Sequence, residues 1–365
     1  MEQYQVSARK YRPKGFEQVV GQEHITTTLE NAIGDNHLAQ ALLFCGPRGV
    51  GKTTCARIVA KMVNGFDQEK NQNSLNIYEL DAASNNSVDD IRNLVDQVRF
   101  PPQHGKYKVY IIDEVHMLSN SAFNAFLKTL EEPPSYAIFI LATTEKHKII
   151  PTILSRCQIF DFNRIQIIDI AKHLKKIADA EGIEAEDEAL RLIAQKADGA
   201  LRDALSLFDL IVTFSAGNKI TYQETISNLH ILDHDYYFKI TSTLLQEDLS
   251  NSLLIFDEII KKGFDGHLFL VGLAEHMRNL LVCQHESTIK LLEVSNQVKE
   301  SYLRQSKEAS SSFLLTALNI INKFDQSYKS SKNQRLHVEL ALMKIAHINA
   351  AITLAQADFE KKKVS

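Results

Sequence analysis

A glycine-rich segment is the feature of this sequence that most constrains its fold. Residues 46–53 read GPRGVGKT and stand between the apolar run QALLFC and the helical pattern TTCARIVAKMV. A strand, a loop and a helix are thus predicted in the order that a phosphate-binding loop requires. Glycines let the backbone wrap a phosphate, and the helix N-terminus presents free N–H groups to it. The segment predicts a nucleotide site within an α/β domain.

Individual roles follow from the chemistry of such a loop. Lys52 is expected to reach the β- and γ-phosphates, and the Thr53 hydroxyl is expected to ligate Mg²⁺. The residues expected to contact the nucleotide here are Gly46, Pro47, Arg48, Gly49, Val50, Gly51, Lys52, Thr53 and Thr54.

A second apolar run, KVYIID, ends in two adjacent carboxylates, Asp113 and Glu114. Strand tips are where a doubly wound sheet keeps its site. Asp113 is expected to hold Mg²⁺ through water, and Glu114 to orient and deprotonate the water that attacks the γ-phosphate. An acidic pair at a strand end is by itself more often a solvated turn. Behind a phosphate-binding loop, the catalytic interpretation is favoured.

The hydrophobic pattern divides the chain of 365 residues into three predicted domains. Apolar runs alternate with helical patterns up to residue 162, which predicts a parallel sheet covered by helices in residues 1–164. Three helix-like segments, ending near Gly182, Gly199 and Gly217, predict a small helical domain in residues 165–221. Residues 222–365 read as almost entirely helical, and their broad apolar stripes suit either an internal bundle or contacts with neighbouring subunits. The predicted strands are QALLFC, NIYEL, KVYIID, AIFILATT and QIFDF.

Composition limits the environment and the partners of the chain. The formal net charge is -4, so any contact with nucleic acid needs a local basic patch. There is no apolar leader and no apolar stretch approaching about 18 residues, which predicts a cytoplasmic protein without membrane contact. Four scattered cysteines form no metal-binding or disulfide pattern, and Cys45 and Cys55 are expected to be small buried residues.

Two arginines are candidates for neutralising the charge that develops during phosphoryl transfer. Arg156 lies in the segment SRC, and Arg202 lies in the segment GALRD. An arginine supplied to such a site is worth orders of magnitude in rate. Taken alone, each of the two reads more readily as an ordinary surface or ion-paired residue.

Several longer segments together resemble one known family. They are ARKYRPKGFEQVVGQEHI, GPRGVGKTT, ELDAASNNSVDDIR, YIIDEVHMLS, FNAFLKTLEEPP, LATTEKHKIIPTILSRC and GALRDALSLFD. This combination resembles the gamma/tau subunits of bacterial DNA polymerase III, which are the ATPases of the replicative clamp loader. The resemblance runs from about residue 7 to residue 215, and the last third of the chain is similar only in its helical character.

The resemblance implies an AAA+ module of a sheet domain and a helical lid, followed by a helical collar through which subunits assemble into an open ring. It implies that Lys52 and Thr53 belong to the Walker A motif of an ATP site, and Asp113 and Glu114 to its Walker B motif. It also implies sensor and adenosine-contacting residues around that site. These are Thr144 as sensor 1, Arg156 as an arginine finger acting on ATP in a neighbouring subunit, Arg202 as sensor 2 acting in cis, and Tyr11, Arg12, Pro13, Val19 and Val20 around the adenosine.

The resemblance further implies a function and a set of partners. ATP binding at subunit junctions would tighten the spiral that holds a sliding clamp open, and hydrolysis on primer-template DNA would release the clamp. The implied partners are other clamp-loader subunits, copies of this chain, the sliding clamp, and the DNA backbone without sequence specificity.

Two features depart from the family pattern. The interval MVNGFDQEKNQNSLNIYEL contains no cysteine where many members carry a four-cysteine zinc module, so no zinc site and no metal other than Mg²⁺ are expected. The sequence ends at Ser365, whereas the tau form continues into regions that bind the helicase and the polymerase. Tethering of those enzymes is therefore not assigned to these residues.

Two alternative functions remain at this stage. A catalytically silent structural subunit of the same assembly is expected to have lost Lys52, Thr53 or Glu114, and all three are present. The letters DEVH at residues 113–116 also fit a DExH-type nucleic-acid translocase. That class needs a second RecA-like domain with strands of its own, and the later half of the sequence reads as helical.

Overall fold

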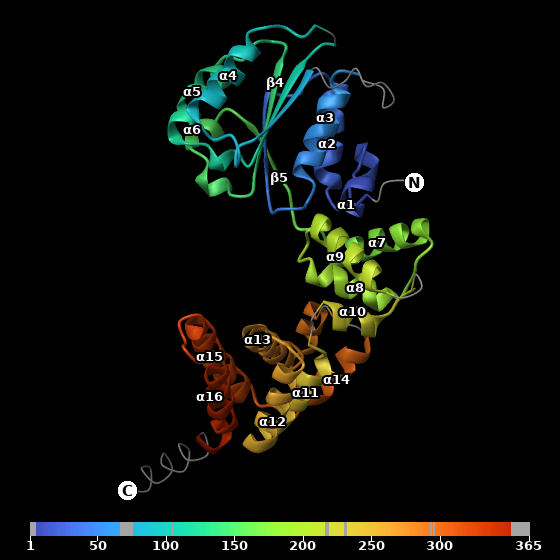
Figure 1. Cartoon of the computed structure of the whole chain (residues 1–365), viewed down its shortest axis with the longest axis vertical. Helices are drawn as coiled ribbons and strands as arrows, with labels where there is room; N and C mark the ends of the chain where they lie inside the picture. Colours follow the sequence, from blue (N-terminus) through green and yellow to red (C-terminus); the bar gives the residue numbers. More distant parts are fainter. Residues whose placement is uncertain are drawn as a thin grey trace. The chain divides into compact units, whose positions relative to one another are not determined.

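The computed structural model describes residues 5–65, 76–103, 105–215, 219–229, 232–292, 294 and 296–351. The chain forms two compact units, residues 1–225 and residues 226–365, and each is described by itself. Figure 1 draws the course of the chain through both.

A parallel sheet of five strands forms the centre of the first unit, in the order β2-β3-β4-β1-β5. The strands are β1 (Ala41–Cys45), β2 (Ile77–Asp81), β3 (Lys108–Asp113), β4 (Ala137–Thr143) and β5 (Gln158–Asp161). All of β1 and β4 is buried, as is β3 up to its last residue, which explains their near-continuous apolar sequences. The predicted parallel α/β sheet is confirmed.

Helices cover both faces of this sheet (Figure 1). Alternate residues of β1 point to opposite faces: Leu42 and Phe44 join a core with α2 (Glu23–Gly34) and α3 (Lys52–Met62). Ala41, Leu43 and Cys45 join a second core with α4 (Val88–Val98) and α5 (Asn120–Glu131). Short helices complete the sheet part: α1 (Ser7–Lys10), η1 (Phe16–Gln18), η3 (Val115–Met117), η4 (Lys146–Lys148) and α6 (Pro151–Leu154).

A local hydrogen-bonded cap determines where α4 begins. The sequence predicts this helix from the acidic residues Asp89 and Asp90 before IRNLVDQV. Ser87 and Asp90 form a reciprocal capping box, in which each side chain accepts a backbone N–H of the other at 3.2 Å. This start orients the apolar face of the helix, with Ile91 and Leu94, toward the sheet.

The small helical part of the first unit contains α7 (Ile167–Glu181), α8 (Asp187–Lys196) and α9 (Leu201–Phe214), which confirms the predicted lid. Gly182 ends α7 with a φ of 68°, a left-handed conformation that glycine adopts without strain. The expectation of helices alone was incomplete, because β6 (Glu184–Ala185) pairs in parallel with β7 (Lys219–Ile220). Gly217, a predicted helix end, lies outside the described residues. The lid belongs to the same compact unit as the sheet, and the boundary after residue 164 stays a prediction.

Helix α10 (Tyr222–Asn228) spans the sequence boundary between the two units, and helices are the only regular elements among the described residues of the second unit. A core that includes Phe256, Phe269 and Phe313 holds them together. These helices are α11 (His234–Leu245), α12 (Leu249–Lys261), α13 (Gly266–Val282), η5 (Glu286–Leu291), α14 (Asn296–Ser306), α15 (Ser311–Tyr328) and α16 (Gln334–Ala346). The predicted all-helical domain is confirmed.

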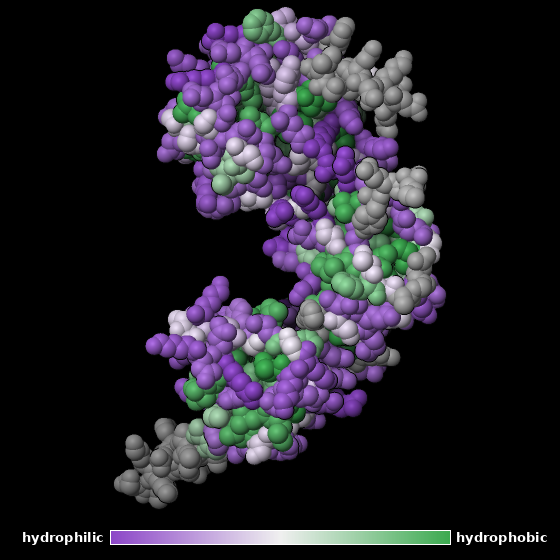
Figure 2. Space-filling view, in the orientation of Figure 1, coloured by the Kyte–Doolittle hydropathy of each residue, from purple (hydrophilic) through white to green (hydrophobic). Residues whose placement is uncertain are grey.

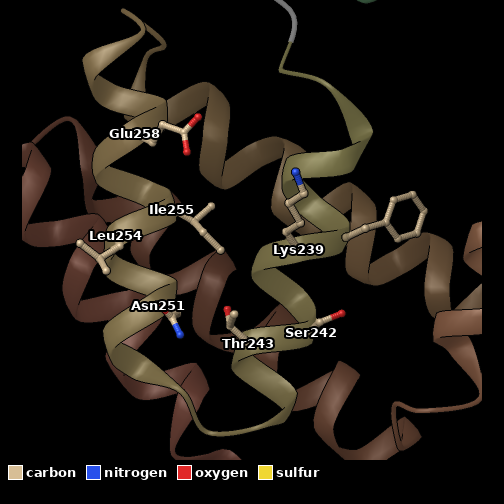
Figure 3. Close-up of a pocket in the computed structure, with 8 residues that line it drawn as sticks. Lys239, Ser242, Thr243, Asn251, Leu254, Ile255 and Glu258 are labelled. Carbon is tan, nitrogen blue, oxygen red and sulfur yellow. The ribbon is translucent and has the colours of Figure 1, made fainter.

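The surface of the second unit combines apolar patches with a groove. Apolar patches are visible on the face drawn in Figure 2, and the large apolar side chains that this unit exposes include Leu254, Leu268, Val271 and Leu315. Figure 3 shows the groove, a cavity of about 500 Å³ between α11 and α12. No helix in the described part of the chain is long and apolar enough to cross a membrane.

Candidate nucleotide site

A cavity of about 420 Å³ in the first unit brings most of the predicted site residues together. Its walls come from the loop after β1, the ends of β2 and β3, the N-terminal segment and the start of α9, so it lies at the carboxyl edge of the sheet. The predicted residues that line it are Tyr11, Arg12, Pro13, Val19, Val20, Arg48, Gly49, Val50, Gly51, Lys52, Thr53, Thr54, Asp113, Glu114 and Arg202.

Glycine is required at two points of the loop between β1 and α3. Gly46 has a φ of 147°, and a Cβ atom there would lie 2.4 Å from the carbonyl oxygen of Phe162. Gly51 has a φ of 106° and caps the start of α3, so the chain reverses just before the helix N-terminus. The loop therefore presents α3 end-on to the cavity, as an anion site requires.

Lys52 is the charged group most deeply placed in the site, with 6% of its surface exposed. Its Nζ atom donates to the carbonyl oxygens of Gly46 and Pro47, each at 2.7 Å. Gly46 and Pro47 thus orient the lysine and do not line the cavity themselves. Burial lowers the pKa of Lys52, and the neighbouring carboxylates of Glu114 and Asp113 oppose that shift.

Two oxygen donors adjoin in the position expected for Mg²⁺. The Thr53 hydroxyl donates to Asp113 Oδ2 at 2.7 Å, and the Glu114 N–H donates to Asp113 Oδ1 at 3.0 Å. A hydroxyl and a carboxylate are hard oxygen ligands, and a magnesium site typically needs only one or two such protein groups beside phosphate oxygens and water. The residues present therefore fit the ion.

Glu114 is placed by the turn that follows β3 and by a neighbouring threonine. Its φ of 48° is left-handed, which turns the chain out of the strand. Glu114 Oε2 accepts hydrogen bonds from the Thr144 hydroxyl at 2.9 Å and the Thr144 N–H at 3.2 Å. Thr144 thus touches the site through Glu114, although it is not among the residues that line the cavity.

The lid closes the cavity from the side of α9. The N–H of Arg202 donates to the carbonyl oxygen of Gly49 at 3.3 Å, so the first turn of α9 is bonded to the glycine-rich loop. A Cβ atom on Gly49 would lie 3.0 Å from Ala200 Cβ, so the loop and the start of α9 approach each other closely. Gly49 also has a φ of 78°, which favours glycine. The Arg202 side chain is exposed and lines the cavity.

The N-terminal segment is fastened to the lid. The N–H of Ser7 donates to Asp209 of α9 at 2.8 Å, and both Lys10 and Tyr11 bond to Glu181 of α7. Burial and the bond to Glu181 raise the pKa of Tyr11. Tyr11, one of the residues predicted around the adenosine, is therefore bonded to the lid, whose helix α9 carries Arg202.

Arg156 does not line the cavity of its own chain. Its guanidinium pairs with Glu131 at 2.7 Å and donates to the carbonyl oxygen of Thr152 at 2.7 Å, and 33% of the side chain is exposed. The pairing with Glu131 was not predicted, because it joins the ends of two separate helical segments.

Six lining residues were missed by sequence reasoning: Ala8, Asp81, Ala83, Ile165, Leu201 and Leu205. Asp81 had a readable signal, because it directly follows the predicted strand NIYEL and lies opposite Asp113 in the sheet register. Leu201 and Leu205 are apolar residues of the lid helix α9, and their sequence gives no sign of a place in the cavity. Only the contact of α9 with the loop shows that they also face the cavity.

Cys45 and Cys55 are small buried residues, as expected. Burial raises the pKa of Cys45 to about 11 and that of Cys55 to about 12, so neither is a reactive thiolate. The interval expected to lack a zinc module includes residues 66–75, which lie outside the described residues.

Three family models match successive parts of the chain. Residues 21–166 match the delta subunit of DNA polymerase III, residues 169–217 match the ATPase lid domain of a DNA polymerase III clamp loader subunit, and residues 220–357 match domain III of the gamma and tau subunits. The three matches follow the sheet, lid and helical parts of the fold.

Curated relatives extend the match over the whole chain. The tau subunit of Bacillus subtilis DNA polymerase III is 40% identical, over 99% of this chain and 67% of that protein. The gamma subunit of Buchnera aphidicola (Baizongia pistaciae) is 34% identical over 95% of this chain and 98% of its own length. The Escherichia coli tau subunit is 38% identical, and the chain spans 46% of that longer protein.

Solved structures support the fold alone. The RuvB Holliday junction branch migration motor of Thermotoga maritima superposes with a TM-score of 0.50 at 22% identity, covering 64% of this chain and 79% of that one. The strand order, the glycine-rich loop and the acidic strand end define an AAA+ ATPase. Together with the relatives, they show that the chain belongs to the gamma/tau subunit family of bacterial DNA polymerase III, the ATPase subunits of the clamp loader. The described part of the second unit is helical and lies within the match to domain III of the gamma and tau subunits.

Proposed function

We propose that the cavity binds ATP with Mg²⁺ and that hydrolysis of this ATP drives the loading of a sliding clamp onto primed DNA. The observation that carries the proposal is the convergence of Lys52, Thr53 with Asp113, and Glu114 on one cavity at the carboxyl edge of the sheet. The fixed lysine, the pair of oxygen ligands and the carboxylate are the groups that phosphoryl transfer to water requires.

Each residue has a distinct task in this proposal. Lys52 and the N–H groups at the start of α3 bind the β- and γ-phosphates, and Thr53 and Asp113 hold the Mg²⁺ ion, which neutralises phosphate charge when bound. Glu114, held by Thr144, orients the attacking water and accepts its proton. Arg202 reaches the same nucleotide from α9, and the N-terminal segment encloses the adenosine.

Arg156 serves the neighbouring site in this proposal. It is partly exposed and stands outside its own cavity, so a second subunit can present its nucleotide to it. An arginine given in trans stabilises the charge of the transition state and makes hydrolysis depend on assembly. The proposal includes a ring of companion subunits and copies of this chain, with collar contacts made by residues 222–365.

The remaining partners follow from the same assembly. The sliding clamp and primer-template DNA are the substrates, and DNA is contacted through its backbone without sequence readout. Such contact releases counterions, so we expect loading to weaken steeply as the salt concentration rises. A cytoplasmic location, where the replication machinery works, is part of the proposal.

Steady-state ATP hydrolysis tests this function. The rate is measured for the chain alone and then with companion loader subunits, sliding clamp and primed DNA, at one salt concentration. We expect strong stimulation that needs both the clamp and the DNA. Stimulation by single-stranded DNA alone would favour a translocase, and no hydrolysis in any combination would favour a silent structural subunit.

The trans role of Arg156 has its own test. Arg156→Ala protein is expected to bind ATP normally and to lose about 10³-fold in hydrolysis at the adjoining site. Mixing it with Lys52→Ala protein should restore part of the activity, because some junctions then pair an intact ATP site with an intact arginine. No recovery in assemblies that contain both proteins would contradict the trans role.

A further inference from the structure

His116 is a buried polar residue of the site region to which the mechanism above gives no task. It lies on η3, two residues after Glu114, and only 6% of its side chain is exposed. A polar ring at such depth needs partners, because an unpaired buried donor or acceptor is costly.

The ring of His116 stands between two carboxylates. Its Nδ1 atom lies 3.0 Å from the Thr143 hydroxyl and 3.4 Å from Glu114 Oε2, and its Nε2 atom lies 3.3 Å from Glu145 Oε1. The N–H of Glu145 donates to the Thr143 hydroxyl at 3.0 Å. Both edges of the imidazole are therefore fixed by residues at the end of β4.

The same contacts fix one oxygen of Glu114. Oε2 receives both bonds from Thr144 and stands beside the imidazole, and the hydrogen bonds and ion pairs recorded for this side chain in the described part of the chain all go to Oε2. A carboxylate held through one oxygen offers the other, Oε1, to a water molecule in the cavity that Glu114 lines.

We propose that His116 is a positioning residue for Glu114: it occupies the space behind Oε2 and, with Thr144, keeps Oε1 directed at the attacking water. Glu145 anchors the far edge of the ring, and Lys148 in turn bonds to Glu145 at 2.9 Å. His116 does not touch the nucleotide in this proposal, which rests on the proposed ATPase function. Loss of the ring lowers the rate of hydrolysis and leaves ATP binding unchanged.

Two substitutions of His116 separate positioning from packing. His116→Leu keeps a buried side chain and removes both ring nitrogens, whereas His116→Asn retains an amide group close to the position of Nδ1. In the assembled loader with clamp and primed DNA, we expect kcat to fall about 10- to 100-fold for His116→Leu, as for other lost supporting contacts. His116→Asn is expected to recover most of that loss.

Two measurements besides activity accompany the rates. The ATP dissociation constant, measured with Mg²⁺ in the absence of clamp and DNA, and the midpoint of thermal unfolding are expected to stay at the wild-type values in both variants. In a Glu114→Gln background, His116→Leu should cause no further loss of kcat, because its effect passes through that carboxylate.

A normal kcat for His116→Leu overturns the proposal, as does a loss of kcat matched by weaker ATP binding or by a lower unfolding midpoint. Failure of the wild-type protein to bind and hydrolyse ATP would instead contradict the proposed function itself.

Discussion

Two cavities in the described part of this protein are similar in size and different in what surrounds them. The one in the first unit measures about 420 Å³ and the groove of the second unit about 500 Å³. Charged groups on separate strands and helices converge on the first, where the loop after β1 also presents a helix N-terminus. The groove lies between two consecutive helices.

Several polar groups of the groove are paired with nearby residues. Thr243 bonds to Ser252 at 2.8 Å, and Glu258 accepts from the Tyr236 hydroxyl at 2.6 Å and from Lys262 at 2.9 Å. In the site, Lys52 is buried, and the neighbouring carboxylates of Glu114 and Asp113 oppose the effect of burial on its pKa. Converging charge and loop geometry, and not volume, therefore distinguish the cavity proposed to bind the nucleotide.

Removing the lysine of the nucleotide site should cause the largest loss of activity. Lys52→Ala deletes the buried cation that opposes the phosphate charge, so we expect ATP turnover in the assembled loader to fall about 10³-fold or more. Turnover with saturating ATP is the measurement, and unchanged unfolding behaviour is the control. Retention of more than a tenth of the wild-type rate would contradict the role of Lys52.

Adding a side chain to the glycine-rich loop should reduce ATP binding nearly as strongly. In Gly46→Ala the new Cβ meets the backbone oxygen of Phe162, so we expect a loss of about 3 kcal/mol in the free energy of unfolding together with loss of ATP binding. Gly182→Ala is the matched control, because Gly182 also has a positive φ, 68°, but has open space around its Cβ position. That variant is expected to lose about 1 kcal/mol and to bind ATP normally. Equal losses in the two variants would contradict the steric argument.

The second unit should respond to acid through a buried histidine. Burial lowers the pKa of His276 from 6.5 to about 4, and its ring nitrogens bond to Tyr302 and Gln305. Between pH 6.5 and pH 4, His276 is protonated in the unfolded chain and neutral in the folded unit. The free energy of unfolding therefore falls as the pH is lowered through this range. We expect a loss of about 2 kcal/mol between pH 8 and pH 5 from this group.

Urea unfolding at several pH values, followed through the transition of the second unit, measures how the free energy of unfolding depends on pH. His276→Gln should weaken this pH dependence. An unchanged pH dependence in the variant would show that other groups cause the acid sensitivity.

A change in the groove should have the smallest effect. Leu254 lines the groove and is 65% exposed, so Leu254→Ser removes apolar surface that is already in water. For the chain alone, we expect its ATP affinity to stay within about twofold of the wild type and its stability within about 0.5 kcal/mol. A marked loss of ATP affinity would mean that the groove contributes to nucleotide binding.

Much of the fold could be predicted because the three central strands of the main sheet, β1, β3 and β4, are buried on both faces. The five apolar runs became β1 to β5 in chain order. The pair β6 and β7 could not be predicted, because two residues per strand are too few to establish a period and the pairing joins Glu184 to Lys219 across the lid.

The site was predictable where it lies on one short motif and not where it depends on strand order. Gly46 to Thr54 follow from a single loop, and Asp113 and Glu114 follow from one strand end. The contact of Glu114 with Thr144 and His116 exists because β4 lies between β1 and β3, an order that spacing along the sequence does not reveal. Thr144 was indicated by family resemblance alone, and the pairing of Arg156 with Glu131 by neither route.

Photolabelling tests the central claim, that the charged cavity is the ATP site, most directly. The chain is irradiated with 8-azido-ATP and Mg²⁺, digested, and the labelled peptides are identified by mass spectrometry, with Lys52→Ala and Leu254→Ser as matched variants. We predict label in residues 8–20 or 201–205, competed by ATP, absent from Lys52→Ala and retained in Leu254→Ser. Label in residues 238–258, or label at the charged cavity that persists in Lys52→Ala, would contradict the account.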